Sequence, residues 1–284
     1  MNASVTAAHL RLELSSRADN VPLVRQVLAG VADVTSLPSA DLSDIGTATT
    51  EACNNVAMHA YAGGEGPLEV ELLVDGSSMA VTVRDRGVGL AIGLPRSGFP
   101  PDVDGELSGI GVLAILALAR SVRWSAPDGG GTAVEMAFST GLPTSAEASS
   151  IRRSLAPLAI APAQLADTVE VEMAPLAVAR GVLPRLLRAV ATRAHFSIDR
   201  HSDAQRVGTA LLADDSIWDA AGGVQARLAV VDSATLEVAI GPLDAHEARR
   251  TADAARAVDS GLDTSIMPFS RGERLVVRMG RARP

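Results

Sequence analysis

Residues 51–61, "EACNNVAMHAY", place polar side chains at regular intervals in a segment that is otherwise apolar. Residues four apart lie on one face of an α-helix, so Glu51, Asn55 and His59 are expected to form a polar stripe. Carboxylates, amides and imidazoles can bind ligands or exchange protons, but a solvent-exposed helix face would also carry them. The stripe is therefore either an exposed face or part of a site.

A second candidate segment, "VTVRDRGVGL", ends an expected strand with Asp85. Gly87 and Gly89 follow, and glycine permits positive φ angles and close approach of the backbone to a ligand. Many β-turns share this pattern, so the segment alone is not specific.

Two further glycine-rich segments follow. In "GELSGIGVLAI", Gly109 and Gly111 come directly before an expected helix, where free backbone N–H groups and the helix dipole favour phosphate. The segment "DGGGT" at 128–132 precedes a strand and could be only a hairpin turn.

Composition excludes several kinds of function. The net charge of -8 argues against a nucleic-acid backbone as the main partner. All 25 basic residues are arginine, which excludes a P-loop lysine and a Schiff-base lysine. The single Cys53, the absence of a recognisable leader and the short apolar runs favour a cytoplasmic protein without a membrane span.

The elements that would position these segments follow from periodicity and turn residues. The long Gly/Pro-rich stretch at 86–111 is too irregular for a simple connection, and such loops are usually functional. The expected order is a strand at 10–16, helices at 20–34 and 39–61, a hairpin at 67–85, the loop, a helix at 112–122 and a hairpin at 122–139.

A similar pattern begins again near residue 169. "VEVEM" at 169–173 matches "LRLEL" at 10–14, and "RVGTALLADDSIWDAAGG" at 206–223 matches the segment that contains Glu51. The same element order suggests a duplicated domain. We expect a domain at 1–142, a Pro/Ala/Ser-rich linker at 143–168 and a second domain at 169–284.

The second copy keeps the apolar pattern but loses the polar residues. In this alignment Ala213 answers Glu51, Ile217 answers Asn55, and "PLDAH" answers "DRGVG". We expect the helix itself to persist through Ala213 and Ile217. Because a copy with the same architecture does without Glu51 and Asn55, the comparison favours a site over a structural role for them.

The order of the four segments resembles the four boxes of the GHKL (Bergerat-fold) ATPases, and most closely the bacterial anti-sigma factor serine kinases. The resemblance covers residues 10 to about 140. It implies an α+β fold, a two-layer α/β sandwich with helices on a largely antiparallel sheet. The second copy would be a degenerate version of the same fold that lacks the nucleotide motifs.

The resemblance implies a role for each residue. Glu51 would act as the base, Asn55 would coordinate Mg²⁺ at the ATP phosphates, Asp85 would accept the adenine amine, and Thr132 would support the ring through water. Arg25 matches a position that contacts the partner in such kinases, although a solvated helix arginine would look the same.

The glycines also receive roles from the resemblance. Gly87 and Gly89 would make room for the base, and Gly109, Ile110 and Gly111 would bring backbone amides to the phosphates. His59 and Tyr61 are expected to be structural.

Two departures bear on catalysis. Leu107 stands where some relatives have a basic residue near the γ-phosphate, although Arg86 or Arg96 could substitute. The expected lid, residues 91–108, contains two consecutive prolines and could be stiffer than a mobile lid.

The implied function is an ATP- and Mg²⁺-dependent serine/threonine protein kinase. It would phosphorylate a small anti-anti-sigma (STAS-like) protein and hold a sigma factor, with no direct contact to nucleic acid or membrane. It could form a dimer, or the second copy could replace a second subunit. The alternative is a non-catalytic regulatory module that acts by protein contacts. A sensor histidine kinase is disfavoured because no phosphoacceptor-histidine helix precedes the domain.

Overall fold

The computed structural model describes residues 5, 7–89, 110–140, 167–232, 234–269 and 272–280. Residues 7–140, here called the first half, contain every strand and helix expected there. They are β1 (Ala7–Ser15), η1 (Ala18–Asn20), α1 (Val21–Thr35), α2 (Ser39–Asn55), the π-helical turn η2 (Val56–Ala60), β2 (Pro67–Asp75), β3 (Ser78–Asp85), α3 (Ile110–Leu118), β4 (Ser121–Ser125) and β5 (Ala133–Ser139).

Residues 167–280, here called the second half, repeat this order of elements. They are β6 (Thr168–Ala174), α5 (Leu176–Arg193), α6 (Ile198–Leu211), α7 (Asp215–Ala221), β7 (Val224–Val231), β8 (Thr235–Leu243), α8 (Ala245–Val258), β9 (Asp263–Phe269) and β10 (Gly272–Gly280).

The expectation of one helix through Ala213 and Ile217 was wrong, because α6 ends at Leu211 and α7 begins at Asp215. The Asp214 side chain accepts a hydrogen bond from the backbone N–H of Ser216 and so starts a new helix.

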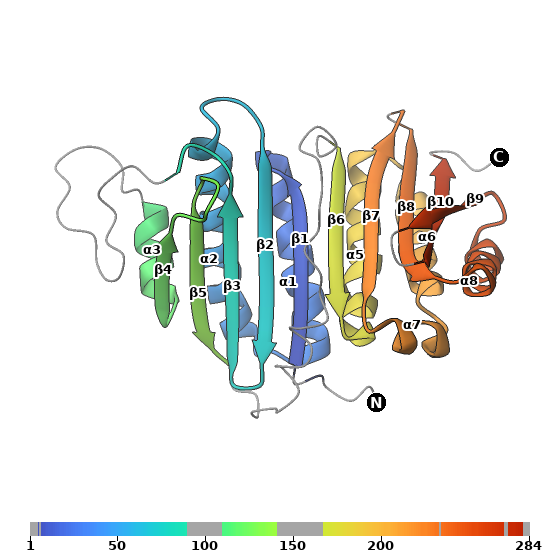
Figure 1. Cartoon of the computed structure of the whole chain (residues 1–284), viewed down its shortest axis with the longest axis horizontal. Coiled ribbons are helices and arrows are strands. Elements are labelled where there is room, and N and C mark those ends of the chain that lie inside the picture. The colour runs from blue at the N-terminus through green and yellow to red at the C-terminus, as the bar shows by residue number, and fades with distance from the viewer. Residues whose placement is uncertain are drawn as a thin grey trace.

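The described strands form one continuous sheet of ten, in the order β4-β5-β3-β2-β1-β6-β7-β8-β10-β9. Every neighbouring pair is antiparallel. Figure 1 shows the helices on one face of this sheet. The expected two-layer α+β arrangement is confirmed for the described residues, while most of the expected linker, 143–166, lies outside them.

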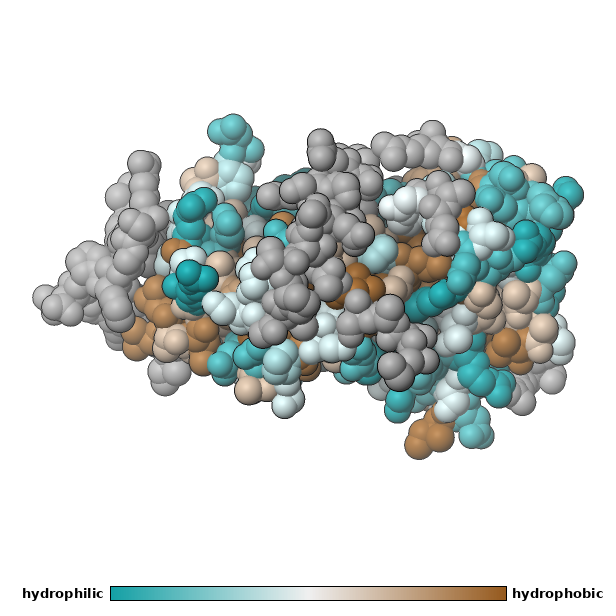
Figure 2. Space-filling model, turned by 90° about the horizontal axis from the view of Figure 1, so that it is seen from below, coloured by the Kyte–Doolittle hydropathy of each residue, from teal (hydrophilic) through white to brown (hydrophobic). Residues whose placement is uncertain are grey.

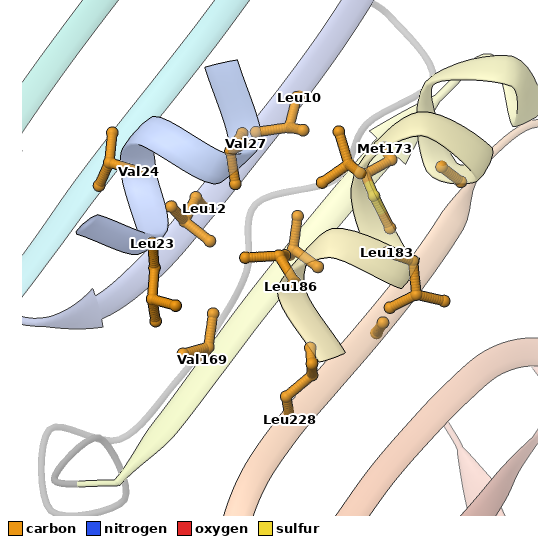
Figure 3. Close-up of a cluster of buried hydrophobic side chains, with 14 of the residues drawn as sticks. Leu10, Leu12, Leu23, Val24, Val27, Val169, Met173, Leu183, Leu186 and Leu228 are labelled. Atoms are coloured by element: carbon orange, nitrogen blue, oxygen red, sulfur yellow. The ribbon is translucent and has the colours of Figure 1, made fainter. Parts of the chain in front are cut away.

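Alternation along the strands separates the two faces of the sheet. In β1, Leu10, Leu12 and Leu14 are buried and point to the helix side, so Arg11 and Glu13 point to the opposite, open face. Figure 3 shows Leu10 and Leu12 beside side chains of α1, with side chains of α5, β6 and β7 continuing the cluster. One apolar core therefore runs under both halves.

The two halves meet where β1 pairs with β6, with Leu12 opposite Val171. Above this seam α1 packs on α5. A Cβ atom at Gly30 would lie 2.6 Å from the carbonyl oxygen of Gly181, so the helix backbones touch directly. Asp33 and Arg185 add an ion pair at the seam.

The end of the molecule that carries α3 is apolar. The helix reads "IGVLAILAL", and Leu113 on it is half exposed. Figure 2 shows apolar side chains gathered at this end. None of the helices in the described ranges combines the length and the apolar composition that a bilayer crossing requires.

Candidate functional site

Glu51 lies on the last part of α2 and faces the first turn of α3. A Cβ atom at Gly111 would lie 2.7 Å from Oε2 of Glu51, so the carboxylate in its observed position lies directly against this glycine. The Glu51 side chain is only partly exposed. The structure therefore brings together Glu51 and Gly111, which are 60 positions apart in the sequence, and it places the carboxylate at the start of a helix.

Glu51 also borders a surface hollow between α1 and α2, here called the α1–α2 hollow. It has a volume of about 560 Å³, and Arg25, Thr47 and Thr50 line it as well. Arg25 is exposed and has no hydrogen-bond or ion-pair partner among the described residues. A group entering this hollow would meet the Arg25 guanidinium and the Glu51 carboxylate together.

Asn55 ends α2, and the π-helical turn η2 follows directly. The Asn55 side chain is partly exposed and makes no hydrogen bond with the described residues. Such π-helical turns inside helices are frequent at functional sites. The turn brings the carbonyl of Ala60 against the loop after β3, where it accepts a hydrogen bond from Val88 N at 2.9 Å. A Cβ atom at Gly87 would collide with this carbonyl.

Asp85 is buried at the end of β3. Its Oδ1 accepts a hydrogen bond from Gly87 N at 2.8 Å, and its own backbone N–H donates to the carbonyl of Thr132 at 2.9 Å. Gly89 has a φ of +78°, a backbone conformation that favours glycine. A Cβ atom at this position would point toward the carbonyl oxygen of Gly131. Asp85, Gly87, Gly89 and Thr132 are therefore brought together, next to the turn that follows Asn55.

The Tyr61 hydroxyl connects the loop after β3 to the start of β2 by two hydrogen bonds. It donates to the carbonyl of Pro67 at 2.6 Å and accepts from Arg86 N at 2.8 Å. Burial raises the pKa of the Tyr61 hydroxyl, which keeps it protonated as a donor. The structural role expected for Tyr61 is confirmed, whereas exposed His59 shows no contact that would test its role.

Some expected site residues lie outside the described residues. They are Gly109, Leu107, Arg96 and the whole expected lid, 91–108. Of Ile110 only the backbone is described; it begins α3, earlier than the expected start at residue 112, so Gly111 lies inside the helix and not before it.

The described residues fit Mg²⁺ and a nucleotide in their chemistry. Asn55 offers an uncommitted amide oxygen, a hard ligand of the kind Mg²⁺ accepts. No group of three His, Cys, Asp or Glu side chains among the described residues could hold a metal by itself. Buried Asp85 supplies an acceptor at the foot of the site.

The same place in the second half is filled. Ile217, which aligns with Asn55, is 2% exposed, and Trp218 beside it is 1% exposed. The Trp218 indole donates to the carbonyl of Leu211 at 3.1 Å. Arg180, at the position of Arg25 in its helix, donates to the carbonyl of Leu212 and pairs with Asp215. In the second half, the residues that answer Asn55 and Arg25 are therefore buried or bonded within the chain.

Sequence reasoning missed three parts of the structure. It did not anticipate the β1–β6 pairing, nor the helix α8 that directly follows β8. A signal for α8 was present, because Asp244 and Glu247 form a capping box. The fit of Glu51 against Gly111 had no local signal, since it depends on how α2 packs on α3.

Comparison with known proteins identifies relatives of the first half. Residues 14–138 match the model of the histidine kinase-like ATPase domain. The serine-protein kinase RsbW of Bacillus cereus (strain AH187) is 28% identical over 92 residues, which are 32% of this chain and 58% of that protein. RsbW of Bacillus thuringiensis (strain Al Hakam) is 25% identical over 120 residues, 40% of this chain and 75% of that protein. The chain thus spans less than two thirds of the first relative, and the resemblance drawn from the four motifs is confirmed.

Proposed function

We propose that this protein, whose residues 14–138 match the model of the histidine kinase-like ATPase domain, is an ATP-dependent serine/threonine protein kinase that regulates transcription. In this proposal it phosphorylates a small anti-anti-sigma protein of the STAS type and sequesters a sigma factor in the cytoplasm. The similarity to serine-protein kinases supports the activity, and the resemblance to anti-sigma kinases suggests the partners.

The observation that carries the proposal is the position of Glu51. Its carboxylate lies against Gly111 at the start of α3 and also borders the α1–α2 hollow that Arg25 lines. A helix start is where phosphate groups bind, whereas an open hollow is accessible to another protein. A base between these two places can serve a hydroxyl that arrives from a partner.

The residues would then act as follows. Glu51 takes the proton from a serine or threonine hydroxyl as its oxygen bonds to the γ-phosphorus and the bond to the β–γ bridging oxygen breaks, which releases ADP. Arg25 holds the partner at the hollow. Asp85 accepts the exocyclic amine of adenine, and Thr132 supports it through water. Asn55 holds Mg²⁺, which when bound neutralises phosphate charge.

We further propose that the second half is a degenerate copy that replaces a second subunit. The proposed boundaries are 1–142, a linker at 143–168, and 169–284. The equal order of elements and the mirror-like strand order about the β1–β6 seam support this. The buried Ile217 and Trp218 support the loss of nucleotide binding in this copy.

The activity is tested by transfer of labelled phosphate from ATP to a purified anti-anti-sigma protein encoded near this gene. We expect transfer by the wild type and a loss of at least about 100-fold in Glu51→Gln, since removing a general base typically costs 10²–10⁴-fold. ATP affinity, measured in parallel, should change little.

A matched control is Asp44→Asn, which removes an exposed carboxylate from the same helix away from the α1–α2 hollow. It should retain transfer. ATP binding without transfer to any such partner, by wild type and control alike, would replace the kinase with a non-catalytic ATP-binding module.

The pseudo-dimer proposal is tested by the mass of the full chain in solution. Analytical ultracentrifugation should give a monomer across micromolar concentrations, with one nucleotide bound per chain. An obligate dimer, or two nucleotides per chain, would contradict it.

A further inference from the structure

A second cavity lies on the open face of the sheet, away from the helices. It has a volume of about 480 Å³ and is here called the open-face cavity. Strands β1, β2 and β3 form its floor, and the loop after β4 forms one side. The charged side chains that line it are Arg11, Glu13, Glu69, Arg84, Arg86 and Asp128, together with Asp85 at one edge.

Glu13 is the unusual member of this set. The residue is only 1% exposed, yet neither carboxylate oxygen has a hydrogen-bond partner among the described residues. Its neighbours across the strands are also acids, since Glu13 pairs with Glu69 of β2 and with Glu170 of β6. A buried carboxylate without a partner costs several kcal/mol, so most such groups acquire one.

The nearby arginines are committed elsewhere. Arg11 donates to Glu69 at 2.6 Å, and Arg84 donates to Glu69 at 2.6 Å and to Glu71 at 2.9 Å. Arg86 is exposed and makes no ion pair with the described residues. Burial raises the pKa of Glu13, and the Arg86 charge offsets only part of that effect. None of these arginines donates a hydrogen bond to Glu13, so its carboxylate has no counter-ion in direct contact among the described residues.

We propose that the open-face cavity binds a small ligand that presents an ammonium or guanidinium group to Glu13. These groups supply the N–H donors and the positive charge that the two free carboxylate oxygens lack. The cavity volume accommodates a molecule of the size of a basic amino acid. Glu13 points to the opposite face of the sheet from Leu12 and Leu14, so the cavity lies across the sheet from the proposed nucleotide site and adjoins it only at the edge formed by Asp85.

The test is isothermal titration calorimetry of the full chain with methylguanidinium and ethylammonium chloride as probes. Methylurea is the neutral control. We expect at least one cation to bind and methylurea not to bind. Glu13→Gln should weaken binding at least about tenfold, because it removes the charge that strengthens these hydrogen bonds.

The matched control is Glu237→Gln, which removes a carboxylate that Arg278 holds at 2.8 Å on β8, outside the cavity. It should bind the probes as the wild type does. Circular dichroism should show that Glu13→Gln is folded, since the substitution removes a buried charge and keeps the shape.

Two further probes identify the source of the cation. Free arginine binding more tightly than N-acetylarginine amide would indicate a free small molecule, and the reverse would indicate a basic side chain of a peptide. Equal binding of the cations by wild type and Glu13→Gln would overturn the proposal. Absence of binding by wild type up to millimolar concentrations would overturn it too. In that second outcome a loss of stability in Arg86→Ala would assign Arg86 as the counter-ion instead.

Discussion

The two halves of the molecule share an order of elements but differ at the end of one helix. In the first half α2 runs unbroken through Glu51 to Asn55, and both side chains remain partly exposed. In the second half the helix breaks after Leu211, and Ile217 and Trp218 are buried. The first half therefore has polar groups at a hollow where the second half has core.

If the second half is a degenerate copy, as proposed, this difference is how a fold would lose a site without losing its architecture. The second half has buried apolar side chains, Ile217 and Trp218, at the positions that align with partly exposed polar groups of the first half. The arginines differ in the same way, because Arg180 is bound to the carbonyl of Leu212 whereas Arg25 is exposed and has no partner among the described residues. Residues that are poorly used for stability in one half are thus the best candidates for function.

The largest expected difference in stability is between Trp218→Ala and Asn55→Ala. Trp218 is fully buried, so its truncation should lower the free energy of unfolding by about 3–5 kcal/mol. Asn55 is partly exposed and makes no hydrogen bond with the described residues, so its truncation should cost less than about 0.5 kcal/mol. Urea unfolding measures both, and equal losses would contradict the comparison.

The open faces of the two halves should respond oppositely to pH. A hydrogen bond from His9, helped by the charge of Arg84, lowers the pKa of Glu71 to about 2, whereas burial raises the pKa of Glu170. Glu71 therefore stabilises the fold above its unfolded pKa, about 4.3, and this contribution is lost as pH falls toward 2. Glu71→Gln should cost about 2 kcal/mol at neutral pH.

For Glu170 the sign is reversed, because its folded form holds the proton more tightly than the unfolded chain does. Glu170→Gln should stabilise the protein at neutral pH, and the gain should vanish below the unfolded pKa. Unfolding curves of both variants between pH 2 and 7 test this, and changes of the same sign would refute it.

The contact between the halves is tested by Gly30→Ala. The new methyl group would meet the Gly181 carbonyl at 2.6 Å, so we expect a loss of about 1–2 kcal/mol. Gly46→Ala on α2 is the control, because no atom lies within 4 Å of its added Cβ. It should gain up to about 1 kcal/mol from helix propensity. Thermal denaturation should separate the two.

The smallest effect is expected for the two equivalent arginines. Arg180→Ala removes hydrogen bonds of 3.0 and 2.8 Å to the Leu212 carbonyl and should cost about 1 kcal/mol. Arg25→Ala should leave stability unchanged and, if the proposed function holds, weaken binding of the proposed anti-anti-sigma partner. Chemical denaturation and a pull-down with that partner measure the two effects. A stability loss in Arg25→Ala would contradict the predicted difference between the two arginines.

Local patterns in the sequence were enough to predict most elements. Alternation and the turn at Gly76 predicted the β2–β3 hairpin, and the burial of Cys53, whose pKa rises to about 12, was expected for an apolar environment. Pairing of β1 with β6 could not be predicted, because each strand has two edges and its apolar alternation does not choose between them.

The types of residue in the candidate site could be predicted from the sequence, but the contacts between those residues could not. Helical spacing grouped Glu51 with Asn55, yet the packing of Glu51 on Gly111 depends on two helices far apart in the chain. The burial of Glu13 could not be predicted from the sequence either, because a strand pattern assigns a glutamate between leucines to the solvent side.

The continuous sheet has a consequence for how the proposed regulator would respond to the concentration of its ligand. Because β1 is already paired with β6 within the chain, this edge is not available to a second copy. A symmetric dimer has two equal sites and can respond to its ligand in a sigmoidal way, whereas a chain with one competent site follows a simple hyperbola. Joining the halves in one polypeptide also makes their association independent of protein concentration, so the response is the same in dilute and in crowded cells.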